Sequence, residues 1–222
     1  FANSSPGDIT PNLGLTPDSG PGVNSQDSAR IIGERLMGGI ADATEVSGVS
    51  GSGISGIYRW ADISAQEVAG KWTVDGKPGK TSPAILGAAF AASSQEDGGG
   101  EPLLGFNEGE RGGTPWVKQV GNVVIPKEMH DIHDPKEMLL PVGFIPGMLQ
   151  QVFPFYIHRI GGLVLISHGF EATIVSGLRL RRAVAEALDV PLDSVVSQGY
   201  VNGYGHYVTT PEEYSTQNYE GG

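Results

Sequence analysis

Two apolar stretches joined by a pair of glycines constrain the fold more than any other part of the sequence. Residues 152–160 and 162–168 favour strands, and the glycines at 161–162 separate them, as in a hairpin or two adjacent strands. A helix is expected next, over residues 176–188, followed by another buried strand over 194–199. This order predicts a mixed α/β fold in which helices cover a buried, mixed sheet.

The amino-acid composition predicts a loop-rich protein and argues against several kinds of binding partner and metal site. Glycine accounts for 34 of the 222 residues, about twice the usual share, which predicts many tight turns and long loops. With 14 basic and 25 acidic residues the net charge is −11, so nucleic acid and anionic membranes are poor partners for the chain as a whole. The absence of cysteine excludes both a disulfide framework and a thiolate zinc site.

The sequence contains no segment that reads as a membrane span or a targeting signal. No apolar run approaches the length of a transmembrane helix. The first residues have neither the basic region nor the apolar region of a signal peptide. A loop rich in Ser, Pro, Gly and Asn begins almost at once, so we expect structure upstream of residue 1 to be missing.

The first long helix is expected over residues 28–43, capped by Ser25 or Asp27. Its apolar side chains recur at helical spacing, which predicts that they pack against a core. These side chains are Ile31, Ile32, Leu36, Met37 and Ile40.

His130 and His133 form a tempting metal site, because histidines three residues apart share one face of a helix. However, Pro135 follows immediately and no periodic helix surrounds the pair. We therefore expect a surface turn here, leading into a strand at 137–141.

Tyrosine is concentrated at the C-terminal end of the chain. Five of the seven tyrosines lie there, namely Tyr200, Tyr204, Tyr207, Tyr214 and Tyr219. Thr210, followed by a proline and then by Glu213, predicts a capped helix start. Phenols donate and accept hydrogen bonds and, when ionised, ligate hard or borderline metals. They also pack core edges, and spacing alone favours that interpretation.

Two further polar residues occupy positions suited to chemistry. Thr10 precedes Pro11 in a turn-forming run, which either presents the hydroxyl or is an ordinary surface turn. Glu171 lies where a buried strand ends and a helix begins. A carboxylate there can simply cap the helix, or it can bind ligands as in α/β enzymes.

Four segments resemble, in order, the neutral, non-lysosomal ceramidases. The first is Gly-Asp-Ile-Thr-Pro-Asn at 7–12, in which Thr10 stands in place of the family's serine. The second is the Pro-Ala-Ile-Leu-Gly-Ala-Ala-Phe-Ala-Ala run at 83–92. The third begins at Glu171, where Phe170 replaces a glycine, and the last is the tyrosine segment at 207–220.

The resemblance implies a zinc-dependent amidohydrolase that cleaves the N-acyl amide bond of ceramide to sphingosine and fatty acid. Glu171 and Tyr207 would be zinc ligands, Tyr219 would stabilise the oxyanion, and Thr10 would position the amide or the attacking water. The resemblance also implies two histidine ligands upstream of residue 1, which no histidine of this chain matches. Two ligands make a poor zinc site, so the chain alone is expected to be inactive.

By this resemblance, residues 1–222 are the C-terminal portion of a ceramidase-like catalytic domain. The upstream zinc-histidine part and the downstream immunoglobulin-like domain are absent, so the sheet should be incomplete on its N-terminal side. A secreted, cell-surface or periplasmic location and transient contact with a membrane surface are also implied. Two other functions remain open: a non-catalytic lipid-binding or surface protein, for which Thr10 and Phe170 would be early signs of lost activity, and an amidase for another N-acyl lipid or peptide.

Overall fold

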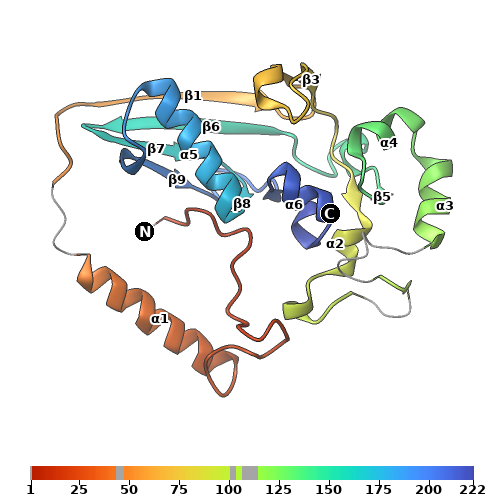
Figure 1. Cartoon of the computed structure of the whole chain (residues 1–222), viewed down its shortest axis with the longest axis horizontal. Coiled ribbons are helices and arrows are strands. Elements are labelled where there is room, and N and C mark those ends of the chain that lie inside the picture. Colours follow the sequence, from red (N-terminus) through yellow and green to blue (C-terminus); the bar gives the residue numbers. More distant parts are fainter. Residues whose placement is uncertain (1, 44–47, 101–103, 107–114) are drawn as a thin grey trace.

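A computed structural model describes residues 2–43, 48–100, 104–106 and 115–222 (Figure 1). The helices are α1 (Ser25–Asp42), α2 (Ala88–Ala92), α3 (Pro115–Val124), α4 (Lys127–His133), α5 (Ile174–Leu188) and α6 (Pro211–Thr216). The strands are β1 (Ile54–Asp62), β2 (Glu67–Val68), β3 (Gly79–Lys80), β4 (Leu86–Gly87), β5 (Met138–Leu140), β6 (Val152–Ile160), β7 (Leu163–Ser167), β8 (Glu171–Ala172), β9 (Val195–Gln198) and β10 (Tyr207–Val208). Two short 3₁₀ turns, η2 (Gln95–Asp97) and η6 (Tyr219–Gly221), border the site described below.

The central sheet has the strand order β1-β6-β7-β9. β6 and β7 form the expected antiparallel hairpin, in which Ile160 pairs with Leu163 across the two glycines. β1 is antiparallel to β6, whereas β9 is parallel to β7. The chain reaches β9 by way of α5, which supplies the crossover that a parallel pair requires. The predicted mixed α/β fold is therefore confirmed.

The main hydrophobic core lies between α5 and the β7–β9 side of this sheet. Val164, Ile166, Ala185 and Val195 are buried together there. The two valines are also direct register partners on adjacent strands. A second buried cluster joins α2 to α3 through Ala88, Ala92, Phe106 and Val117.

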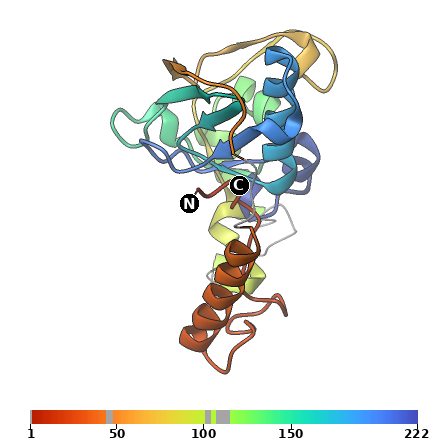
Figure 2. The same ribbon diagram turned by 90° about the vertical axis from the view of Figure 1, so that its left-hand side faces the viewer.

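The apolar side chains of α1 are less buried than the sequence predicts. The helix forms, but Asn24 rather than Ser25 or Asp27 caps it, accepting a hydrogen bond from the Asp27 amide. Leu36 and Met37 are 65% and 60% exposed. Figures 1 and 2 show α1 projecting from the body of the molecule together with the loop before it. The prediction of core packing was therefore wrong for Leu36 and Met37, whereas Ile31, Ile32 and Ile40 are half-buried; periodicity specifies an apolar face but not a partner for it.

The expected surface turn at His130 and His133 was also wrong in its local structure. Both histidines lie on α4, which ends at His133, just before Asp134 and Pro135. His133 Nε2 lies 2.6 Å from the Ser82 hydroxyl oxygen. Within the described ranges, no helix combines the length and hydropathy of a membrane span.

Candidate active site

Glu171 and Tyr207 lie side by side on a two-stranded parallel ladder. β8 pairs with β10 in a register that sets Tyr207 opposite Glu171 and Val208 opposite Ala172. The backbone amides of Glu171 and Thr173 donate to the carbonyl oxygens of His206 and Val208, at 2.9 and 3.0 Å. In parallel strands, register partners project to the same face. The backbone therefore holds the two predicted zinc ligands together.

The loop that carries Thr10 is attached to this ladder. The Gly7 amide donates to the Ala172 carbonyl at 2.9 Å, and a carboxylate oxygen of Asp8 accepts from the Ile174 amide at 2.8 Å. A Cβ atom at Gly7 would lie 3.0 Å from backbone atoms of Glu171 and Ala172, so glycine permits this close approach. The start of the chain is thus brought to the junction between β8 and α5.

All four predicted site residues line one cavity of about 130 Å³. Thr10, Glu171, Tyr207 and Tyr219 contribute to its wall, together with Asp97 and neighbouring residues. The Thr10 hydroxyl accepts a hydrogen bond from the Asn12 amide at 3.1 Å. Four side chains that are distant in sequence therefore surround a single small space.

The acidic turn η2 forms part of the same wall, to which Glu96 and Asp97 contribute. The Asn12 side-chain amide donates to the Glu96 carbonyl at 2.8 Å, which ties the Thr10 loop to this turn. The Ser94 hydroxyl donates to Asp97 at 3.1 Å. The contact with Asn12 links the turn to the loop that carries Thr10.

Tyr219 is fixed by two other aromatic rings. Its ring stacks on Phe90, with ring centroids 5.1 Å apart, and meets the Tyr207 ring edge-on at 5.5 Å. Burial raises the pKa of Tyr219, and burial followed by the negative charge of Glu171 raises the pKa of Tyr207. Because both pKa values are raised, both phenols keep their proton and are hydrogen-bond donors at neutral pH.

Tyr204 is a member of the site that the sequence did not single out. Its hydroxyl donates to Oε1 of Glu171 at 2.5 Å, and the Tyr200 hydroxyl also interacts with this carboxylate. The Tyr204 ring packs against Tyr200 and His206, at centroid separations of 6.2 and 5.1 Å. The concentration of tyrosines in this segment was the available signal, but it did not say which hydroxyl reaches the carboxylate.

The loop that delivers Tyr204 packs closely on Phe170. Phe170 is buried against Phe153 and Phe155, at ring-centroid separations of 4.8 and 5.8 Å. A Cβ atom at Gly205 would collide with the Phe170 ring. The large residue that departs from the family motif at 170 is therefore accommodated by a glycine on the facing segment.

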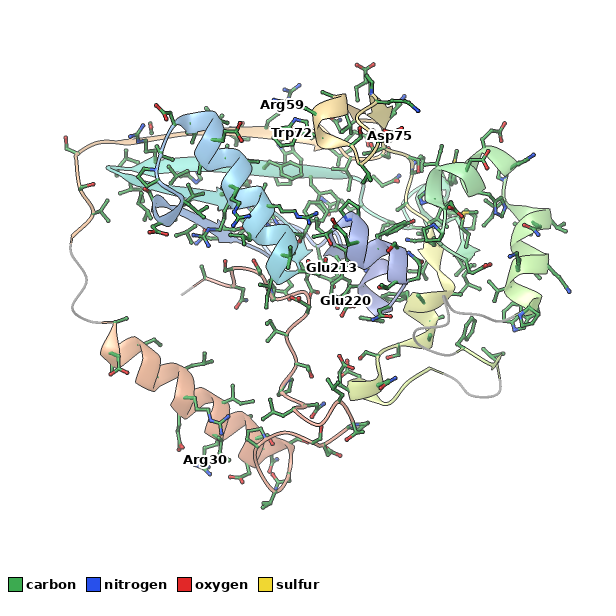
Figure 3. All side chains as sticks on the ribbon, in the orientation of Figure 1. Arg30, Arg59, Trp72, Asp75, Glu213 and Glu220 are labelled. Atoms are coloured by element: carbon green, nitrogen blue, oxygen red, sulfur yellow. The ribbon has the colours of Figure 1, made fainter. Side chains whose placement is uncertain are left out.

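One carboxylate, that of Glu213, connects the starts of two helices beside the site. Glu213 Oε2 accepts from the Thr210 amide and from the Thr173 hydroxyl, both at 2.7 Å. Thr210 in turn accepts from the Glu213 amide at 3.2 Å, which completes the predicted capping box of α6. Thr173 is the N-cap of α5. Figure 3 labels Glu213 on α6 and Glu220 on the C-terminal turn that follows it.

The side chains of the candidate site could supply some, but not all, of the ligands that a zinc ion needs. Glu171 and Tyr207 supply two adjacent oxygens, whereas a structural or catalytic zinc needs at least three protein ligands. No group of three or more His, Cys, Asp or Glu residues suited to holding a metal occurs within the described ranges. His168 is instead a buried core residue, with Nε2 3.1 Å from the Ser197 hydroxyl oxygen.

Comparison with known proteins identifies the family. The family model described as "Neutral/alkaline non-lysosomal ceramidase, N-terminal" matches residues 1–222. The chain belongs to the neutral/alkaline non-lysosomal ceramidase family. The resemblance seen in the sequence is thereby confirmed.

Relatives within the ceramidase family match the whole chain. The chain is 36% identical over 236 residues to a neutral ceramidase of Pseudomonas aeruginosa and 35% identical over 232 residues to one of Mycobacterium tuberculosis. A solved structure described as a ceramidase complexed with C2 superposes with a TM-score of 0.80 at 33% identity. The crystal structure of the Pseudomonas aeruginosa neutral ceramidase gives a TM-score of 0.74 at 30% identity.

The match covers only part of each ceramidase. The whole chain is matched, but it spans 33% and 35% of the two bacterial relatives and 34% and 33% of the two structures. The chain therefore spans about a third of the length of these ceramidases.

Proposed function

We propose that the protein is a hydrolase that cleaves the N-acyl amide bond of ceramide to sphingosine and a fatty acid, and that the reaction depends on zinc. The observation that carries this proposal is the convergence of Thr10, Glu171, Tyr207 and Tyr219 on one small cavity. Membership of the ceramidase family supports the substrate class.

In the proposal, Glu171 and Tyr207 hold the metal with two histidines upstream of residue 1. A zinc ion held by these residues would supply Lewis-acid chemistry, lowering the pKa of a water molecule and polarising the amide carbonyl. Its positive charge would also reverse the influence of Glu171 on the pKa of Tyr207, which favours the phenolate as a ligand.

The other side chains orient the amide and stabilise the charge that develops on it. The Tyr219 hydroxyl donates a hydrogen bond to the scissile carbonyl oxygen, and that bond strengthens as the oxygen becomes anionic. The Tyr219 ring is held between Phe90 and Tyr207, so the donor is preorganised. Thr10 positions the amide or the attacking water through its hydroxyl.

The direct test is sphingosine release from a short-chain ceramide by the full-length protein, with and without a zinc chelator. Release should require zinc and should disappear in Glu171→Ala. Glu186→Ala provides a matched control, because Glu186 is an exposed carboxylate on α5. Zinc content is measured on every variant.

Each negative result has a distinct meaning. Bound zinc without sphingosine release would redirect the proposal to another N-acyl lipid or peptide, which a panel of N-acyl substrates would identify. A folded protein with neither zinc nor release would support a non-catalytic lipid-binding role. Release that persists in Glu171→Ala would overturn the assigned metal ligand.

A further inference from the structure

His168 is a buried polar side chain to which the proposed reaction assigns no role. It directly follows β7, where the chain leaves the central sheet and turns toward Glu171. The residue is 3% exposed, and Ser197, which meets its ring from β9, is fully buried. An imidazole in such a place is costly unless its nitrogens have hydrogen-bond partners.

Both ring nitrogens of His168 have partners, and the partners fix where the ring proton lies. Nδ1 is 3.3 Å from the backbone nitrogen of Phe170, and Nε2 is 3.1 Å from the Ser197 hydroxyl oxygen. A backbone amide can only donate, so Nδ1 is the unprotonated acceptor and Nε2 carries the hydrogen. Burial lowers the pKa of His168, which agrees with a neutral ring.

Backbone hydrogen bonds tie the turn around His168 to β9 and to the loop that follows β9. The His168 amide donates to the Gln198 carbonyl oxygen at 3.1 Å, and the His168 carbonyl oxygen accepts from the Val201 amide at 2.9 Å. The carbonyl oxygen of Gly169 accepts from the Gly205 amide at 2.7 Å. The turn that leads to Glu171 is thus joined to the loop that supplies the tyrosine hydroxyls around its carboxylate.

Phe170 is the residue through which His168 can act on Glu171. The Phe170 amide is held by the imidazole, and the Phe170 ring is buried against other aromatic rings. Glu171 follows directly, and its own amide donates to the His206 carbonyl oxygen at 2.9 Å. A proton on Nδ1 would set two N–H groups against each other, and the turn would have to move.

We propose that His168 is a positioning residue for Glu171, acting through the acceptor nitrogen Nδ1 that holds the Phe170 amide. Loss of this acceptor would leave the amide unpaired in a buried turn and loosen the carboxylate that follows. The effect on zinc rests on the proposed role of Glu171 as a metal ligand, whereas the effect on the turn does not. If His168 only filled space, the acceptor and the donor of its ring would be equally dispensable.

Two substitutions separate the acceptor from the donor. His168→Asn keeps an acceptor oxygen close to the position of Nδ1 and loses the donor to Ser197. His168→Gln reaches Ser197 with its side-chain amide and loses the acceptor for Phe170. Each variant removes one hydrogen bond and some ring volume, so both should lose stability in urea by similar amounts. Only the glutamine variant should disturb Glu171.

Metal binding is measured on the full-length protein by competition with a chromophoric chelator. We expect His168→Gln to lower zinc affinity about tenfold to a hundredfold, the usual effect of losing a partner that orients a ligand. His168→Asn should stay close to wild type. His158→Gln is the matched control, because His158 is exposed on β6, and it should leave zinc affinity unchanged.

Amide hydrogen exchange on the zinc-free protein gives a second readout that needs neither metal nor activity. Exchange at Phe170 and Glu171 should be faster in His168→Gln than in wild type and unchanged in His168→Asn. NMR of the ring nitrogens should show Nδ1 without a proton at neutral pH. If wild type bound no zinc, the role of Glu171 as a ligand would fail, and these two measurements would still decide the positioning role.

The proposal would be overturned by wild-type zinc affinity in folded His168→Gln, by equal exchange at Glu171 in the asparagine and glutamine variants, or by a proton on Nδ1. If neither variant folds, NMR and amide exchange on the wild type decide the question. A protonated Nδ1 or a rapidly exchanging Phe170 amide would show that the imidazole does not hold the turn.

Discussion

The Tyr204 hydroxyl donates a 2.5 Å hydrogen bond to Oε1 of Glu171, across 33 residues of sequence. This bond fixes the orientation of a carboxylate whose backbone is already fixed by β10. Partners that orient a metal ligand contribute about tenfold to a hundredfold in metal affinity or activity. Tyr204 is thus a positioning residue of the proposed zinc site, next to Tyr200, whose hydroxyl also interacts with Glu171.

Removing that hydroxyl should weaken zinc binding and slow hydrolysis together. For Tyr204→Phe we expect zinc affinity to fall about tenfold or more, measured by competition with a chromophoric chelator, with a parallel fall in kcat. Tyr58→Phe is the control, because Tyr58 lies exposed on β1. Wild-type zinc affinity in Tyr204→Phe would show that Glu171 needs no such support.

Thr10 allows the contribution of a hydroxyl to be separated from that of a methyl group. Thr10→Val preserves the branched shape but loses the oxygen that accepts from the Asn12 amide. We expect its kcat to fall about a hundredfold, as when a transition-state hydrogen bond is deleted. Thr10→Ser retains the oxygen and relaxes χ1, so it should remain close to wild type. Single-turnover sphingosine release compares the two, and equal rates would exclude a role for the hydroxyl.

The contact between Gly205 and Phe170 should be visible in stability. Gly205→Ala introduces a Cβ atom into the Phe170 ring, and overpacking of this kind costs about 1–3 kcal/mol of the free energy of unfolding. In the Phe170→Ala background the same substitution should cost much less, as a double-mutant cycle in denaturant would reveal. Gly33→Ala on α1, with open space around the new methyl, should instead be neutral or stabilising by up to about 1 kcal/mol.

Lys136 should make stability depend on pH in the alkaline range. Its pKa is about 8 in the folded protein and 10.5 as an ordinary lysine. Between these values the unfolded chain binds the proton and the folded chain does not, so the free energy of unfolding rises with pH, by at most about 1.4 kcal/mol per unit. The pKa of neighbouring His133 is lowered to about 4 and that of Tyr214 is raised by burial, so neither titrates between pH 8 and 9.5.

Urea denaturation at pH 7.5, 8.5 and 9.5 measures this effect. Wild type should gain stability across the series relative to Lys136→Met, which has no group to titrate at that position. Parallel curves for the two proteins would contradict the lowered pKa of Lys136.

Sequence reasoning succeeded where the signal was local. The capping box of Thr210 and Glu213 and the hairpin at Gly161 and Gly162 follow from residues that are close along the chain. The family resemblance also identified four residues that do converge on one cavity, although their chemical roles remain to be measured.

The failures have a common physical origin in contacts between distant segments. The bond from Tyr204 to Glu171 and the fit of Gly205 to Phe170 depend on how the last loop folds over β8. The apolar stripe of α1 showed which side chains lie on one face, but not whether anything covers them. The pattern of apolar and polar side chains predicts whether a segment forms a helix or a strand. Which other segments pack against it depends on the fold of the whole chain.

The shared carboxylate of Glu213 has a mechanical consequence. Because it joins the first turns of α5 and α6, the strands just before those helices cannot shear past each other without breaking it. The spacing of Glu171 and Tyr207 is therefore held by the protein's own hydrogen bonds. Ligands held at a fixed spacing favour metal ions of one radius over others. Glu213, which would not contact the ion, would therefore contribute to the preference of the proposed site for one metal.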